Sequence, residues 1–172
     1  MIDTGAANRV KAETTYLIRF SVGRQEFGLE IERVVEVIRL GTMLKTSEAR
    51  GCMSGMVHLG EEVVPIIDLR ERLGLPAVPR TPRSRAIVAR IRDELVGMIP
   101  DATHQLTRLS AVIETSLSTE RAASKFVKGT ADLGGRPVEV LDVDRVLSGE
   151  ELTMLRNAVH DLGSAKHSDL SA

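Results

Sequence analysis

Aromatic side chains are scarce in this sequence of 172 residues, which contains three Phe, one Tyr and no Trp. Platforms that bind nucleic acid by base stacking need several exposed rings, so the composition argues against that class. The net charge is −1, from 23 Lys and Arg against 24 Asp and Glu. Duplex-binding domains carry a basic excess, so we expect no nucleic-acid partner.

Cysteine and long apolar segments are also lacking. Cys52 is the single cysteine, which excludes an internal disulfide and a multi-cysteine zinc site. The longest purely apolar run, Val63 to Ile67, is far too short to cross a membrane, and the first residues have no signal-peptide region. We expect a reduced, cytoplasmic location without membrane insertion, and a core built from aliphatic side chains.

An internal repeat is the strongest signal that is present. Residues 55–69 match residues 129–143 at one constant offset, sharing Gly, Leu, Gly, Val, an aliphatic pair and Asp. A fainter match joins residues 18–29 to residues 87–98, with Gly28 aligned to Gly97. The repeat therefore predicts two similar units within the chain.

The predicted units are residues 14–80 and 84–149, each too small to hold a generous core alone, so they should pack together. Pro76–Ser84, which contains three prolines, is the predicted linker. The ends, residues 1–13 and 163–172, are predicted to be disordered.

Strand patterns dominate both units. Thr15–Val22 and Arg85–Ile91 are short β-branched segments bounded by polar turns, and Val63–Ile67 and Val138–Leu141 are typical of returning strands. The turns that would close the hairpins are Gly23-Arg24-Gln25, Gly60-Glu61, Arg92-Asp93-Glu94 and Gly134-Gly135.

Three helices are also predicted. Residues 31–38 carry an apolar stripe at helical spacing. Asp68 and Glu71 form a capping-box pattern that would start a short helix. A C-terminal helix is expected over residues 150–162, where the apolar side chains share one face.

No set of residues indicates catalysis. The four histidines share no ligand spacing, and the glycines around Ser54 do not follow the G-x-S-x-G order of a nucleophile elbow. Cys52 is expected to be a small buried apolar residue. We therefore expect no enzyme activity, metal or cofactor.

Two polar features have competing interpretations. Asp68 and Asp142 occupy equivalent repeat positions and could hold a cation, but a residue where a strand ends and a helical turn begins is typical of an N-cap. The arginine-rich segment from Arg80 to Arg92 could bind phosphate, although a solvated strand face explains the same residues.

The central repeat motif resembles the signature of CheW-like domains. The matching residues are Gly55, Leu59, Val63-Val64-Pro65-Ile66-Ile67-Asp68-Leu69-Arg70, Arg72 and Gly74-Leu75-Pro76, with flanking matches at Phe27-Gly28, Val34 to Ile38, Val96 to Asp101, Phe126 to Gly129 and Val140 to Asp144. The resemblance covers about residues 14–150.

The resemblance implies a mainly β fold of two SH3-like five-stranded β-barrels packed together, with short helices and a C-terminal helix. It implies a scaffold that couples the cytoplasmic tip of a chemoreceptor to the regulatory domain of a CheA-type histidine kinase. Val34 and Glu36 match positions near the receptor-binding groove, and Met98 and Ile99 would line it. Gly60 stands where the family usually has an arginine that makes signalling contacts.

Alternatives remain open at this point. The departure at Gly60 is compatible with a divergent or non-motility pathway, or with a kinase-selective adaptor that lacks standard receptor coupling. A different class is a small ligand-binding β-barrel or hydrolase. A deep apolar cavity between the two units would favour the ligand-binding alternative.

Overall fold

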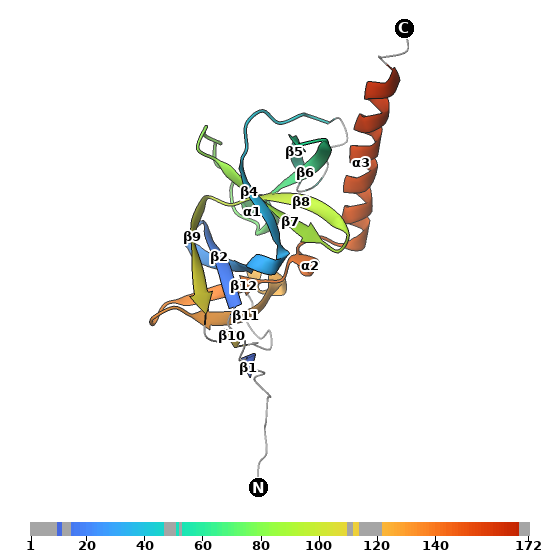
Figure 1. The fold of residues 1–172 in the computed structure, drawn as a ribbon. Helices are drawn as coiled ribbons and strands as arrows, with labels where there is room; N and C mark the ends of the chain where they lie inside the picture. Colours follow the sequence, from blue (N-terminus) through green and yellow to red (C-terminus); the bar gives the residue numbers. More distant parts are fainter. Residues whose placement is uncertain are drawn as a thin grey trace.

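The computed structural model describes residues 10–11, 15–46, 51, 53–109, 112–113 and 122–168. Two β-sheets lie one above the other, and a long C-terminal helix runs along the side of the upper sheet (Figure 1). Cys52 and most of the predicted N-terminal tail lie outside the described residues. The mainly β, two-subdomain SH3-like fold predicted from the sequence is confirmed, and the described strand pairs leave each sheet open.

The upper sheet has five strands and the lower sheet has seven. In spatial order, the upper sheet consists of β4 (Val34–Arg39), β7 (Arg85–Ile91), β8 (Glu94–Ile99), β6 (Glu62–Asp68) and β5 (Met53–Leu59). The lower sheet consists of β1 (Val10–Lys11), β10 (Val112–Ile113), β11 (Val127–Asp132), β12 (Pro137–Leu141), β3 (Gln25–Glu30), β2 (Thr15–Val22) and β9 (Ala102–Leu109). The helical elements are η1 (Ile31–Arg33), α1 (Leu69–Arg72), η2 (Ala122–Phe126), α2 (Val143–Val146) and α3 (Gly149–Ser168).

The sheets do not coincide with the predicted units 14–80 and 84–149. The β2–β3 hairpin joins the lower sheet through a parallel pairing of β3 with β12, and the β7–β8 hairpin joins the upper sheet through a parallel pairing of β8 with β6. Each sheet therefore takes one hairpin from the other half of the chain. A repeat identifies equivalent strands but not their partners, because pairing with either copy satisfies the same backbone hydrogen bonds.

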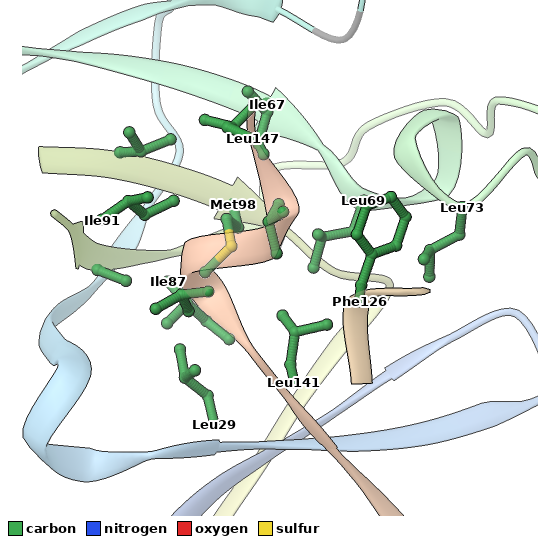
Figure 2. Close-up of a cluster of buried hydrophobic side chains, with 14 of the residues drawn as sticks. Leu29, Ile67, Leu69, Leu73, Ile87, Ile91, Met98, Phe126, Leu141 and Leu147 are labelled. Atoms are coloured by element: carbon green, nitrogen blue, oxygen red, sulfur yellow. The ribbon is translucent and has the colours of Figure 1, made fainter. Parts of the chain in front are cut away.

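Both faces of the central strands are buried. The largest apolar cluster lies between the two sheets and includes Leu29, Ile87, Met98 and Leu141, whose side chains converge in Figure 2. A second cluster lies on the other face of the upper sheet, and a third lies in the lower sheet. Residues 86–89 of β7 alternate between the first two clusters and are all fully buried, which explains why this part of the strand carries no polar residue.

The four predicted hairpin turns are confirmed, since β2–β3, β5–β6, β7–β8 and β11–β12 pair antiparallel. Gly23, Gly60 and Gly134 lie at φ values of +62°, +61° and +61°, which glycine adopts without steric cost. Arg92 occupies the corresponding turn of β7–β8 at φ +54°.

The aspartates of the repeat are helix caps. Asp68 accepts a hydrogen bond from the Arg70 backbone N–H at 2.8 Å, and Asp142 accepts one from the Asp144 backbone N–H at 3.1 Å. This confirms the structural interpretation of both residues. Among the described residues, no three His, Cys, Asp or Glu side chains are grouped so that they could hold a metal ion.

The helix predicted over residues 31–38 is wrong. The chain forms the short 3₁₀ helix η1 and then strand β4. Three of the first four residues of β4 are valines, and β-branched residues favour strands when a neighbouring strand is available, which β7 supplies. The apolar stripe that predicted a helix spans only two turns, which is too short to distinguish the repeat of a helix from the alternation of a strand.

The predicted disordered ends were partly wrong. Val10–Lys11 forms strand β1 against β10. Helix α3 begins at Gly149, one residue before the predicted start, and continues to Ser168, six residues beyond the expected end at 162. Leu152, Leu155 and Ala158 bury its inner face against the large core cluster.

Two ion pairs join the one-turn helices to the segments that enter the edge strands. Arg33 Nη2 lies 2.6 Å from Asp144 Oδ1, and Arg70 Nη1 lies 2.5 Å from Asp101 Oδ2. Partial burial opposes ionisation of Asp144, but Arg33 and the Arg92 backbone N–H outweigh it and hold the pKa of this carboxyl below its ordinary value of 3.8. In the upper sheet the arginine precedes the edge strand β4 and the aspartate lies in the helix α2. In the lower sheet the aspartate precedes the edge strand β9 and the arginine lies in the helix α1.

Helix α3 starts at a reciprocal cap. Glu151 donates its backbone N–H to Ser148 Oγ at 3.1 Å and accepts from the Ser148 backbone N–H at 2.8 Å. Glu151 also accepts two hydrogen bonds from the Arg72 guanidinium, at 2.7 and 2.8 Å. Partial burial would raise the pKa of Glu151, but Ser148 and Arg72 outweigh it and lower the pKa below the ordinary value of 4.5.

We expect Gly97→Ala to destabilise the fold by about 1–3 kcal/mol, as measured by urea unfolding. Gly97 pairs with Ile66 at the parallel junction, where an added Cβ would lie 2.3 Å from Ile66 Cδ1. Gly163→Ala is the matched control, because nothing lies within 4 Å of its added Cβ and alanine favours helix by up to about 1 kcal/mol. Equal effects of the two substitutions would contradict the close packing at this junction.

The lowered pKa of Glu151 predicts a loss of stability in acid. The unfolded chain binds the proton more readily, so the contribution of this carboxylate is complete above about pH 4.5 and is lost as the pH falls toward the lower folded-state pKa. We expect Glu151→Gln to lower the free energy of unfolding by about 0.5–1 kcal/mol at pH 7. Urea unfolding of both proteins should show this difference shrink at pH 4, and a constant difference would reject the assignment.

Candidate partner-binding surface

Strand β4 exposes the clearest apolar and charged surface among the predicted site residues. It forms one edge of the upper sheet and pairs with β7 alone in that sheet. The ladder is irregular between Val34 and Glu36, which pair with the adjacent residues Ala89 and Val88. This bulge leaves Val35 without a partner residue and 49% exposed.

The bulge decides which valine faces solvent. Val34 and Val37 are half-buried and pack against the core cluster between the sheets, whereas Val35 and Glu36 are exposed. Val34 and Glu36 were predicted, from the family resemblance, to lie near the receptor-binding groove. In the observed strand, Val35 supplies the exposed aliphatic surface, and Glu36 lies beside it as a charged neighbour.

Gly60 lies far from β4 within the upper sheet. It occupies the turn between β5 and β6, at the edge opposite β4. Gly60 is exposed, and nothing lies within 4 Å of an added Cβ. The position therefore has room for a longer side chain, although its left-handed backbone is strained for any residue other than glycine.

Met98 and Ile99 do not form a partner surface. Met98 is fully buried in the cluster between the sheets, as Figure 2 shows, and Ile99 is 5% exposed. Their strand, β8, lies in the middle of the upper sheet. The expectation that they line a groove is corrected, because apolar packing on both faces covers their side chains; Ile99 only borders a 180 Å³ hollow near Arg70 and Asp101.

Sequence reasoning missed an exposed apolar pair on the lower sheet. Leu106 of β9 is 53% exposed and Tyr16 of β2 is 42% exposed. Leu106 pairs with Ile18, two residues from Tyr16, so both side chains share one face of the ladder. Strand β9 forms one edge of its sheet, as β4 does. Apolar and polar residues alternate only weakly over residues 102–109, so the sequence did not indicate that Leu106 would be exposed.

A hollow of 320 Å³ lies between α3 and the upper sheet. Its apolar wall includes Val63, Leu95 and Leu155, and its charged wall includes Arg90 and Arg156. Arg156 Nε also lies 2.6 Å from Glu94 Oε1, which ties α3 to β8. Both predicted units and α3 line this hollow, but charged residues make up much of its wall. It is therefore not the apolar cavity that would favour a ligand-binding barrel.

The histidines that the structure describes are not grouped. His58, His104 and His160 are exposed on different elements. Asp68 and Asp142 hold helix starts. None of the described helices is long and apolar enough to cross a membrane.

Two small, mainly β subdomains that share a core define the SH3-like two-subdomain class. The profile of the CheW-like domain family matches residues 17–151, which is most of the chain. The chain therefore belongs to the CheW-like domain family, as its central motif predicts.

Individual relatives agree with this assignment. The chain is 29% identical over 150 residues to "Chemotaxis protein CheW" of Rhizobium meliloti (strain 1021), covering 86% of this chain and 97% of the relative. It is 30% identical over 140 residues to "Probable chemotaxis protein CheW" of Rhizobium etli, covering 78% and 88% of the two chains.

A solved structure supports the fold. The crystal structure of the scaffolding protein TtCheW from Thermoanaerobacter tengcongensis is similar with a TM-score of 0.73 at 24% sequence identity. The match covers 81% of this chain and 97% of that chain. The shared architecture therefore extends over nearly all of the solved protein.

Proposed function

We propose that this chain is a cytoplasmic, non-enzymatic scaffold that couples chemoreceptors to a CheA-type histidine kinase. The observation that carries the proposal is the family match over residues 17–151, together with relatives named as chemotaxis proteins. The exposed surface supports protein binding as the function, because a partner can reach the edge strand β4 of the upper sheet and the edge strand β9 of the lower sheet without any change in the core.

The β4 edge is the surface that we propose for the receptor tip. Val35 offers an exposed aliphatic side chain, and Glu36 offers a carboxylate directly beside it. Small apolar patches with a charged neighbour suit modest, exchangeable contacts, because affinity depends on a few buried anchors rather than on total area. We expect micromolar-range binding, with Val35 replacing Val34 as the aliphatic contact.

We expect Val35→Asp to weaken binding of a receptor cytoplasmic-tip fragment by about tenfold or more in calorimetric titrations. The matched control is Val78→Asp in the linker segment, because Val78 is 46% exposed and Val35 is 49% exposed. Equal binding by both variants would remove β4 from the proposed surface.

The same titrations distinguish the proposed partners. Wild-type protein that binds the kinase regulatory domain but no receptor fragment would support the kinase-selective adaptor instead. Failure to bind either partner from the same organism would reject the scaffold proposal.

Position 60 is the proposed cause of altered receptor coupling. We expect Gly60→Arg to strengthen binding to a standard receptor and to raise kinase activation, because it restores the type of side chain that the family usually carries there. The matched control is Gly134→Arg, since both glycines occupy hairpin turns at φ +61° with no atom within 4 Å of an added Cβ.

Both substitutions should lower the free energy of unfolding by about 1–2 kcal/mol, because arginine is strained at this φ. Only Gly60→Arg should change receptor binding. Unchanged receptor affinity and kinase activation in Gly60→Arg would show that position 60 is not responsible for the divergence.

A further inference from the structure

Two arginines face each other across the edge of the upper sheet. Arg39 of β4 and Arg85 of β7 are direct partners in the antiparallel ladder, and both are exposed. Side chains at such positions project from the same face, with Cβ atoms about 4.5–5.5 Å apart. Like charges placed directly opposite each other destabilise a sheet, so an anion between the two guanidinium groups would relieve a local repulsion.

The turn before β7 carries a third arginine, two residues ahead of Arg85 in the chain. The Ser84 backbone N–H donates to the Thr81 carbonyl at 2.9 Å, and the Thr81 backbone N–H donates to Ser84 Oγ at 2.9 Å. The Leu40 backbone N–H donates to the Ser84 carbonyl at 3.1 Å, which ties the turn to the end of β4. Arg83 is exposed within this turn.

Asp68 and Asp101, which border one hollow together with Thr81 and Ser84 of this turn, already have partners. Asp68 caps α1 through Oδ1, and its Oδ2 lies 3.6 Å from Arg80 Nη2. Asp101 Oδ2 accepts from the Gly23 backbone N–H at 2.7 Å and pairs with Arg70.

In the part of the chain that the structure describes, no carboxylate pairs with the side chains of Arg39, Arg83 and Arg85. This is a local positive excess on a chain whose net charge is −1.

We propose that Arg39, Arg83 and Arg85, here called the arginine corner, bind an acidic segment of a partner protein. A carboxylate placed between Arg39 and Arg85 would replace their repulsion with charge-assisted hydrogen bonds, and guanidinium groups match carboxylates in a bidentate geometry. The absence of a basic excess over the whole chain and the scarcity of aromatic residues favour protein carboxylates over nucleic acid.

The structure also divides the arginine-rich segment that the sequence analysis considered as a phosphate-binding strip. Arg85 lies at the start of β7, whereas Arg90 lies near the other end of that strand and Arg92 lies in the following turn. The arginine corner goes beyond the proposed scaffold function, because it requires neither the β4 bulge nor Gly60.

The test is fluorescence anisotropy with a fluorescein-labelled oligoglutamate peptide. We expect Arg39→Gln/Arg85→Gln to bind about fivefold more weakly than wild type. The matched control is Arg24→Gln/Arg90→Gln, which removes the same charge from two other exposed arginines outside the corner and should bind as wild type does. Equal loss in both double variants would overturn the proposal in favour of a general charge effect.

Two further measurements sharpen the result. Arg85→Glu places opposite charges across the ladder from Arg39, so it should raise the melting temperature and abolish peptide binding. Retained peptide binding in Arg85→Glu would overturn the proposal. Oligothymidylate of matching charge that binds as tightly as the peptide, with the same loss in Arg39→Gln/Arg85→Gln, would also overturn the assignment to an acidic protein segment.

The peptide experiment is independent of receptor and kinase binding. Val35→Asp should leave peptide binding at the wild-type level, so a failure of the scaffold proposal and a failure of the arginine corner give different patterns across the same variants.

Discussion

The parallel pairing of a hairpin from one half of the chain with a strand from the other is the constraint on which the rest of the structure depends. β3 pairs with β12 and β8 pairs with β6, so neither sheet is complete without both halves. The two junctions also share a glycine, Gly28 in one and Gly97 in the other, each with an aliphatic side chain where a Cβ would lie. The missing Cβ at each glycine leaves room for the side chain of Leu17 or Ile66, so the buried strands pair without a steric clash.

This arrangement decides where partners can bind. Because the apolar residues of the central strands β7 and β8 are buried on both faces, they are not available to another protein, whereas Arg85 at the start of β7 is exposed. The accessible surface lies at edge strands, turns and the outer side of α3. Val35, Glu36 and the arginine corner all lie at the β4 edge or its adjoining turn, whereas Gly60 lies across the sheet.

Local features of this protein were predictable because each depends on a few neighbouring residues. The hairpin turns follow from glycine at positive φ, and the caps at Asp68 and Asp142 follow from a carboxylate that reaches backbone N–H groups two residues ahead. The β4 strand was missed because residues 31–38 satisfy helical and extended patterns, and only pairing with β7 selects the strand. The sites of Met98 and Ile99 were misjudged because their burial comes from elements distant in the chain.

By itself the sequence determined the mainly β class, the internal repeat, the turns and the family, since these are recorded in local patterns and in one specific motif. Tertiary structure alone decided which hairpin completes which sheet, which valine the β4 bulge turns outward, and that Arg39 meets Arg85. The scarcity of aromatic residues argued against a base-stacking surface, but it did not show which aliphatic residues are buried and which are exposed. The physical reason is that strand pairing joins residues through interchangeable backbone hydrogen bonds, so side-chain burial across the whole chain selects the partner.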